Sequence, residues 1–91
     1  MLREGIELQV TKIGSNRWAK FVRVRDNCLF ASGSHRPFAG KLRELKAAFK
    51  AYSAEDLAFA NSLNFEGLDK NSEDAQRAIR IRNDLVAMIY A

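Results

Sequence analysis

The sequence predicts an α+β fold, a three-stranded antiparallel β-meander followed by three α-helices. The first third of the chain alternates polar and apolar residues with a period of two, which is typical of half-buried strands. Later segments carry apolar residues at spacings of three and four, which is typical of amphipathic helices. With 91 residues the chain is long enough for one domain with a modest core. We therefore expect a single domain over residues 1–91, with the meander in 1–33 and helices in 38–52, 53–63 and 72–90.

The stretch Arg17–Arg25, which reads R-W-A-K-F-V-R-V-R, is the strand around which the predicted sheet is organised. Asp26-Asn27 suits a two-residue hairpin turn after it, because both residues tolerate a positive φ. Gly14-Ser15-Asn16 suits a three-residue turn before it, following a first strand over residues 6–13. Residues 1–5 are expected to be a short lead-in outside the sheet.

The two turns determine the register, which decides the face on which each side chain lies. They pair Val22 with Leu8 and with Ala31. They also pair Val24 with Leu29. The predicted buried face carries apolar residues from all three strands, namely Ile6, Leu8, Val10, Trp18, Val22, Val24, Leu29 and Ala31. The predicted solvent face carries aromatic rings among cations, namely Arg17, Phe21, Arg23, Arg25, Cys28 and Phe30.

A loop over Ser32–Pro37 leads to the first predicted helix. Two stripes of side chains follow a helical spacing along this helix. The apolar stripe, which we expect to be buried, consists of Leu42, Leu45, Phe49 and Tyr52. A basic stripe flanks it at the same spacing one residue later and consists of Arg43, Lys46 and Lys50.

Ser53 and Ser72 are natural N-caps for the other two helices. Arg82 lies in the middle of the apolar arc predicted for the last helix. We expect its stem to pack on the core while its guanidinium reaches out to an acidic partner. The alternative is that this part of the helix meets a binding partner's carboxylate or phosphate, which arginine binds through two parallel hydrogen bonds. The arc consists of Ala75, Ala78, Ile79, Leu85, Val86 and Ile89.

Charge is distributed unevenly along the chain, which carries a formal net charge of +4. Residues 1–52 contain eleven Lys and Arg against four Asp and Glu, a net of +7. Residues 53–91 contain four Lys and Arg against seven Asp and Glu, a net of −3. Either the basic half binds a polyanion while the acidic half supports it, or the acidic helices neutralise the basic sheet within the molecule.

No motif indicates catalysis. A single cysteine and a single histidine cannot form a Cys/His zinc cluster, and the chain has no Gly-rich phosphate loop and no hydrolase motif. Cys28 and His35 are a poor choice for a nucleophile and base, because a lone cysteine is usually a small apolar filler. Helix starts account for carboxylates such as Glu73 and Asp74. We therefore expect no enzyme activity, no metal and no cofactor.

The chain has no apolar segment of membrane-spanning length and no signal segment. Its one cysteine excludes an internal disulfide. We therefore expect a cytoplasmic, intracellular protein without a membrane partner.

Cations and aromatic rings on the predicted solvent face favour binding of DNA or RNA, since Lys and Arg contact phosphates and exposed rings stack on unpaired bases. The order of three strands and a helix, over about half of the chain, resembles the AP2-type and integrase arm-binding domains, in which such a sheet reads DNA. Arg82 is a further candidate for partner contact. The candidate binding residues are Arg17, Lys20, Phe21, Arg23, Arg25, Phe30, His35, Arg36, Arg43, Lys46 and Lys50.

Two other interpretations stay open. Arginine and aromatic residues are also enriched at protein interfaces, so the same residues suit a protein-interaction module. Such a module is a small inhibitor or accessory factor, of phage or mobile-element origin, that docks on an acidic surface of a larger, nucleic-acid-processing enzyme. In a purely structural interpretation, helices cover both faces of the sheet, Phe21 and Phe30 belong to the core, and the arginines rim it. The burial of these two rings decides whether an exposed aromatic face exists.

Overall fold

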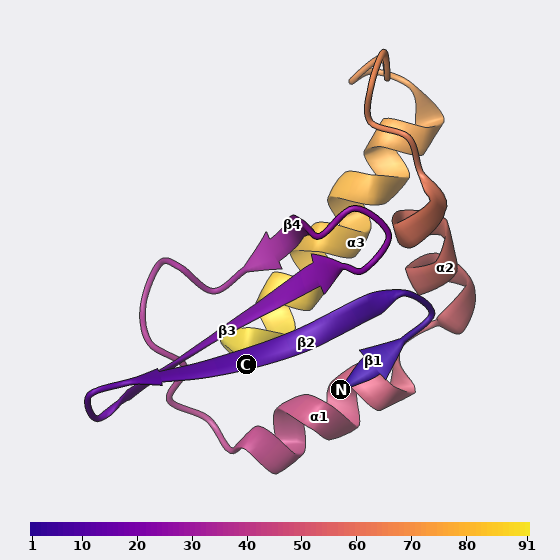
Figure 1. Cartoon of the computed structure of the whole chain (residues 1–91). Coiled ribbons are helices and arrows are strands. Elements are labelled where there is room, and N and C mark those ends of the chain that lie inside the picture. Colours follow the sequence, from indigo (N-terminus) through magenta and orange to yellow (C-terminus); the bar gives the residue numbers. More distant parts are fainter.

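A computed structural model describes all residues, 1–91, as a four-stranded antiparallel sheet followed by three helices (Figure 1). The strands lie in the order β1-β2-β3-β4, so each pairs with its neighbour in sequence. The predicted α+β class and the order of sheet before helices are confirmed, but the predicted number of three strands is wrong. The elements are β1 (Leu2–Arg3), β2 (Ile6–Ile13), β3 (Asn16–Arg23), β4 (Cys28–Ser32), α1 (Leu42–Ala51), α2 (Ala54–Ser62) and α3 (Glu73–Ile89).

The additional strand β1 lies in the segment predicted to be a lead-in. A tight turn with a positive φ at Gly5 folds it back on β2, so that Arg3 pairs with Ile6. Arg3 Nη1 donates hydrogen bonds of 2.7 Å to the carbonyl oxygens of Phe49 and Tyr52. These carbonyls lie at the C-terminal end of α1, where unpaired carbonyls and the helix dipole favour a cation. Strand β1 therefore fastens the sheet to α1.

The turn between β2 and β3 has two residues, Gly14 and Ser15, rather than the predicted three. Gly14 has a φ of 63°, a left-handed conformation that glycine adopts without strain. Leu8 consequently pairs with Phe21 and not with Val22. A shift of one residue turns every side chain of a strand to the other face of the sheet. The predicted solvent face of β3 is therefore its buried face.

The pairing of β3 with β4 also differs from the prediction. Arg23 pairs with Cys28, so the loop between the strands contains the four residues Val24–Asn27 instead of two. A β-bulge then interrupts the ladder and leaves Phe30 as the residue of β4 without a pair. Its ring turns into the core, since a bulge bends the strand and redirects the side chain at that point.

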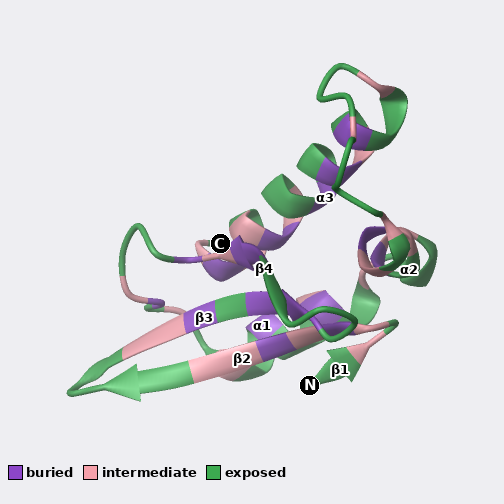
Figure 2. Ribbon diagram, turned by 45° about the horizontal axis from the view of Figure 1, so that its top comes forward, coloured by how far each residue is buried: buried purple, intermediate pink, exposed green.

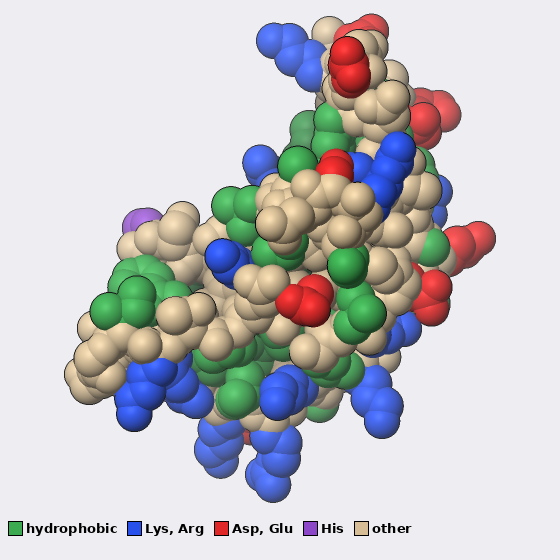
Figure 3. Space-filling model, viewed as in Figure 1, with side chains coloured by type: hydrophobic (Ala, Val, Ile, Leu, Met, Phe, Trp, Pro, Cys, Tyr) green, Lys and Arg blue, Asp and Glu red, His purple; other side chains and the backbone are tan.

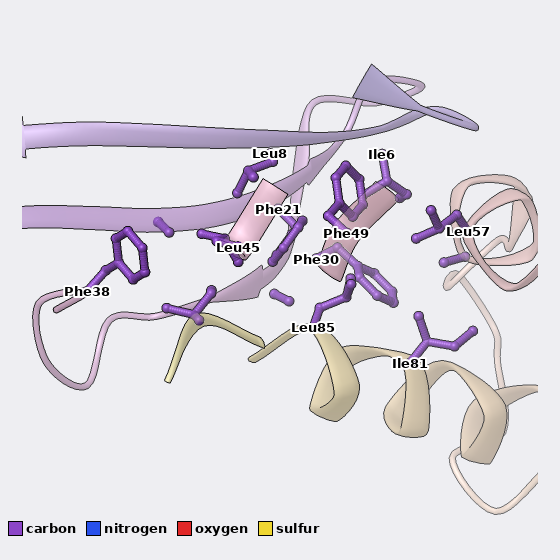
Figure 4. Close-up of a cluster of buried hydrophobic side chains, with 14 residues drawn as sticks. Ile6, Leu8, Phe21, Phe30, Phe38, Leu45, Phe49, Leu57, Ile81 and Leu85 are labelled. Atoms are coloured by element: carbon purple, nitrogen blue, oxygen red, sulfur yellow. The ribbon is translucent and has the colours of Figure 1, made fainter. Parts of the chain in front are cut away.

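The buried face of the sheet packs on the helices around one apolar cluster (Figures 2 and 4). Figure 2 shows buried residues where the sheet and the helices face one another, while the tip of the β2–β3 hairpin is exposed. The rings of Phe21 and Phe49 are fully buried, and their centroids are 5.0 Å apart. Phe21 and Phe30 are therefore core residues. The cluster consists of Ile6, Leu8, Ala19, Phe21, Phe30, Ala31, Phe38, Leu45, Phe49, Leu57, Ala60, Ile81, Leu85 and Ile89.

The predicted buried face of the sheet is correct for β2 and only partly correct for β4. Burial is confirmed for Ile6, Leu8, Val22 and Ala31. It is wrong for Val24 and Leu29, which are 51% and 60% exposed. Val24 is exposed because it lies in the loop between β3 and β4. Leu29 is exposed because it pairs with Val22, which the one-residue shift between β2 and β3 turns to the side of the sheet away from the helices.

The three helices lie within the predicted ranges. The hydroxyls of Ser53 and Ser72 each accept a hydrogen bond of 3.2 Å from the N–H group three residues later, which confirms them as N-caps. In α3 the predicted core residue Ile79 is 39% exposed, and Ile81 is fully buried in its place. None of the helices is both long enough and apolar enough to cross a membrane.

Candidate functional site

The predicted solvent face of rings and guanidinium groups does not exist, because its central members are buried. Phe21 is 0% exposed, Arg23 1% and Phe30 8%. Arg23 lies on the helix-facing side of β3, where its Nη2 is 3.1 Å from Asp26 Oδ2. The change of register described above placed all three side chains inside. Neither ring is available to stack on a base, so these three residues leave the candidate binding set.

Arg17 and Arg25 are engaged in contacts within the chain. Arg17 Nη2 donates to the Gly40 carbonyl oxygen at 2.8 Å, and its guanidinium carbon lies 4.8 Å from the centre of the Phe38 ring. Arg25 Nη1 donates to the Ser62 carbonyl oxygen, at the end of α2, at 2.5 Å. A cation at this position satisfies an unpaired carbonyl of the helix end. Both arginines have a structural function that accounts for them without a binding partner.

His35 and Arg36 gather around Tyr90, near the end of α3. The Arg36 guanidinium carbon lies 4.8 Å from the centre of the Tyr90 ring, and the His35 ring meets that ring edge-on at 6.2 Å. The Tyr90 hydroxyl accepts a hydrogen bond from Arg36 N–H and donates one to the Arg36 carbonyl oxygen, both of 3.0 Å. These contacts join the loop after β4 to α3. The side chains of His35 and Arg36 stay exposed.

The basic stripe of α1 faces outward as a unit. Arg43, Lys46 and Lys50 are all exposed, whereas Leu45 and Phe49, which alternate with them in sequence, are buried. The three Cα atoms span about 10 Å along the helix, because each residue of an α-helix advances 1.5 Å. No carboxylate lies within ion-pair distance of any of the three cations. The chain therefore leaves their charge free for a partner.

Ion pairs form within the two halves of the chain and not between them. The four ion pairs join Arg23 to Asp26, Arg77 to Asp56, and Arg80 to both Asp56 and Asp84. The acidic helices therefore do not neutralise the basic half through ion pairs. Figure 3 shows that basic and acidic side chains lie on different parts of the surface. Lys and Arg side chains gather along the lower edge, over α1, and Asp and Glu side chains lie mainly above and to the right.

Asp56 is the centre of the ion-pair network in the acidic half. Its Oδ1 accepts from Arg77 Nη2 at 2.8 Å and its Oδ2 from Arg80 Nη2 at 3.1 Å. The hydrogen bond from Arg77, supported by Arg80, holds the pKa of Asp56 below its ordinary value against the opposing effect of desolvation. The Tyr52 hydroxyl donates to Asp84 Oδ2 at 2.7 Å, and burial together with this hydrogen bond raises the pKa of Tyr52. These side-chain contacts join α2 and the C-terminal end of α1 to α3.

Lys20 is exposed but does not join the basic stripe. It alternates along β3 with the buried Ala19 and Phe21, so it points away from the helices. Trp18, predicted to be a core residue, is half-buried on the same outer face because of the register shift. Trp18 and Lys20 both line a hollow of about 340 Å³. The alternation of residues along β3 fits either face as the buried one. Only the length of the turn between β2 and β3 shows that Trp18 and Lys20 lie on the outer face.

Arg82 is exposed, and the acidic partner expected for it is not present in the chain. Its one hydrogen bond runs from Nη2 to Asn83 Oδ1 at 3.4 Å. It lies at an apolar groove between β4 and α3, which Leu29 and Ile79 also line. The sequence pattern places both of these apolar residues in the core, and therefore gives no sign of the groove.

No group of three or more His, Cys, Asp or Glu side chains is arranged to hold a metal ion. No hydrogen bond joins Cys28 to His35, and the cysteine is free and exposed. Comparison of the chain with protein-family models, with curated proteins and with solved structures finds no match. The resemblance to the AP2-type and integrase arm-binding domains therefore rests on the order of elements alone.

Proposed function

We propose that this chain binds nucleic acid through the basic stripe of α1, by contacts with the phosphate backbone. The observation that carries the proposal is that Arg43, Lys46 and Lys50 are exposed along one helix with no carboxylate paired to any of them. Free cations gathered on one surface create a positive potential, which attracts a polyanion. Most acidic side chains in Figure 3 lie away from α1, and Glu44, in the first turn of α1, forms no ion pair with the stripe.

The basic stripe suits the backbone of a duplex better than individual bases. It contains no aromatic ring for stacking, and Phe21 and Phe30 lie in the core. Duplex DNA carries one negative charge per about 1.7 Å of its axis, more than a single strand, so binding driven by charge favours the duplex. The expected binding is independent of base sequence and strongly dependent on salt.

Fluorescence anisotropy with a labelled duplex at several salt concentrations tests the proposal. In the variant Lys46→Gln/Lys50→Gln, we expect the affinity to fall at least about tenfold at low salt. We also expect the slope of log K against log salt to decrease by about two, since two phosphate contacts are lost. Circular dichroism checks that the variant folds, which the exposure of both lysines favours.

The matched control is Asn64→Asp/Asn71→Asp, which lowers the net charge by the same two units at exposed positions in the loop after α2. Both variants are also compared at about 0.1 M salt, where a charge acts over only about 10 Å, and there we expect this control to keep its affinity within about twofold. Equal losses in the two variants, or no duplex binding by the unaltered chain at low salt, would overturn the proposal.

The alternative for the basic stripe is an acidic protein surface, which presents carboxylates instead of phosphates. Polyglutamate matched in total charge to the duplex serves as the competitor that separates the two. If polyglutamate displaces the labelled duplex only at concentrations at least about tenfold higher than unlabelled duplex requires, the result supports nucleic acid as the partner. Displacement at equal concentrations assigns the stripe to an acidic protein surface and overturns the proposal.

A further inference from the structure

An apolar groove runs between the edge strand β4 and helix α3. Two adjoining hollows form it, with volumes of about 300 and 400 Å³, and they share Leu29, Phe30 and Arg82. Phe65, from the loop after α2, and Ile79, from α3, complete the apolar wall of the first hollow. Figure 3 shows hydrophobic side chains along this flank, where β4 meets α3. The groove is separate from the basic stripe of α1.

Strand β4 offers a free edge beside this groove, since the sheet ends with it and its outer side pairs with no strand. Its sequence, C-L-F-A-S, contains no charged residue and no proline. Charged residues and proline are two common means by which proteins protect a sheet edge from further pairing, and a third, a β-bulge, lies at Phe30 in β4. Leu29 is exposed along this edge. A free edge next to apolar pockets is the kind of surface on which an extended peptide adds as a further strand.

The charges along the groove have one sign. Arg82 lines both hollows and Lys70 lines the first, whereas no Asp or Glu lines either. Arg82 takes part in none of the ion pairs of the chain. A guanidinium beside an apolar surface pairs best with a carboxylate, which it holds through two parallel hydrogen bonds. The groove is therefore complementary in charge to an acidic side chain.

We propose that this groove binds an extended peptide of a partner protein, which adds as a strand to β4 and carries apolar residues and a carboxylate placed on Arg82. The five residues of β4 span about 17 Å, so a peptide of five or six residues matches its length. Seven of the nine residues that line the first hollow are hydrophobic. A nucleic-acid strand does not suit this lining, because its phosphates lose water there with few polar groups to replace it.

Selection from a library of random heptapeptides, followed by NMR titration with the best binder, tests the proposal. We expect the binders to combine Val, Ile or Leu with Asp or Glu. We also expect the amide signals of β4 and of the facing turns of α3 to shift on titration. Successive N–H groups of an extended peptide point to opposite edges, so N-methylation of either the odd or the even residues removes the hydrogen-bond donors of one edge. We expect the set whose N–H groups face β4 to weaken binding at least about tenfold when methylated, and the other set to have little effect.

Several outcomes would overturn the proposal. These are a selection that yields no binder or only binders without a carboxylate, and signal shifts confined to other surfaces. If neither set of methylated peptides, odd or even, binds more weakly than the unmethylated peptide, strand addition is excluded. Displacement of the peptide by a duplex oligonucleotide assigns the groove to nucleic acid, and chain dimerisation that occupies the groove assigns it to a second copy of the chain.

Two matched pairs of variants test the contact with the carboxylate. Leu29→Glu and Leu29→Lys remove the same apolar side chain from the groove wall and introduce opposite charges, so both weaken binding of the peptide. Because the peptide is acidic, we expect the loss of affinity for Leu29→Glu to exceed that for Leu29→Lys at least about tenfold. Arg82→Gln is compared with Lys12→Gln, which removes one cation from an exposed position of β2 away from the groove. We expect a loss of about tenfold for Arg82→Gln alone. Equal losses within either pair would overturn the proposal.

Discussion

The guanidinium carbon of Arg23 lies 4.5 Å from the centre of the Phe65 ring, so a residue of a surface loop closes over a buried cation. Phe65 also stacks on Phe30, with ring centroids 6.5 Å apart. It thereby joins the loop after α2 to β3 and β4, and it forms part of the wall of the groove beside β4. One partly exposed ring serves both the stability of the sheet and the shape of the groove.

Replacing Phe65 with alanine removes both ring contacts and opens Arg23 to water. We expect Phe65→Ala to lower the free energy of unfolding by about 1–3 kcal/mol, through lost apolar burial and the lost cation–π contact. Urea denaturation measures the change. Phe65→Tyr keeps the ring and is expected to cost less than about 0.5 kcal/mol. An alanine variant as stable as the unaltered chain would show that the ring covers nothing of importance.

Arg23 is a buried cation whose Nε and Nη1 have no hydrogen-bond partner. Its one ion pair is with Asp26, and an apolar side chain of similar volume often stabilises a protein as well as such a buried pair. We expect Arg23→Met to keep or raise the urea midpoint. We expect Asp26→Asn to lower it, because the guanidinium then stays buried without its counter-charge. A lower midpoint for Arg23→Met than for Asp26→Asn would mean that the guanidinium itself stabilises the sheet.

The stability of the fold is expected to decline at acid pH, in part through Asp56. Hydrogen bonds from Arg77 and Arg80 lower its pKa in the folded state, so the unfolded chain takes up the proton at a higher pH. This stabilisation is present above the unfolded pKa of about 4 and is lost as the pH falls through the folded pKa. Asp26, whose pKa is also lowered, contributes with the same sign.

Urea denaturation between about pH 6 and pH 2 checks this expectation. The variant Asp56→Asn cannot titrate at this position, so we expect its stability to decline less steeply across the range. It is also expected to be less stable than the unaltered chain near neutral pH, because Arg77 and Arg80 lose a charged acceptor. The same pH dependence in both proteins would assign the acid sensitivity to other carboxylates.

At alkaline pH the expected change comes from Tyr52. Burial, and then the hydrogen bond to Asp84, raises its pKa above the ordinary value of about 10. The corresponding stabilisation is present below the unfolded pKa and is lost as the pH rises toward the folded pKa. In the variant Tyr90→Phe, ultraviolet absorbance is expected to record tyrosinate at a higher pH for the folded protein than for the same protein in urea. Adding Asp84→Asn is expected to bring the titration curves of the folded and the urea-unfolded protein closer together. Coincident curves in the protein that retains Asp84 would contradict the buried hydrogen bond.

The helices could be predicted from the sequence because their pattern is local. The spacing of Leu42, Leu45 and Phe49 defines the inner side of α1 within a few turns. The direction of the basic stripe then follows without reference to any other element. The caps at Ser53 and Ser72 are equally local, since a hydroxyl and an N–H three residues later suffice.

The faces of the strands could not be predicted with the same success, because they depend on the length of a turn. Both sides of β3 mix cations with apolar residues, so its alternation fits either face. One residue fewer in the turn at Gly14 and Ser15 moved Phe21 and Arg23 into the core. Arg82 has no acidic partner because of the way in which β4, the loop after α2 and α3 pack together. The spacing of residues along α3 alone cannot predict this packing.

The separation of the cations over α1 from most of the carboxylates makes the molecule an electric dipole. Near a highly charged polymer such a molecule rotates before it touches, so it arrives with α1 in front more often than chance allows. Added salt shortens the reach of this torque, from about 30 Å at 0.01 M to about 8 Å at 0.15 M. The rate at which the protein associates with the polymer therefore falls as salt is added.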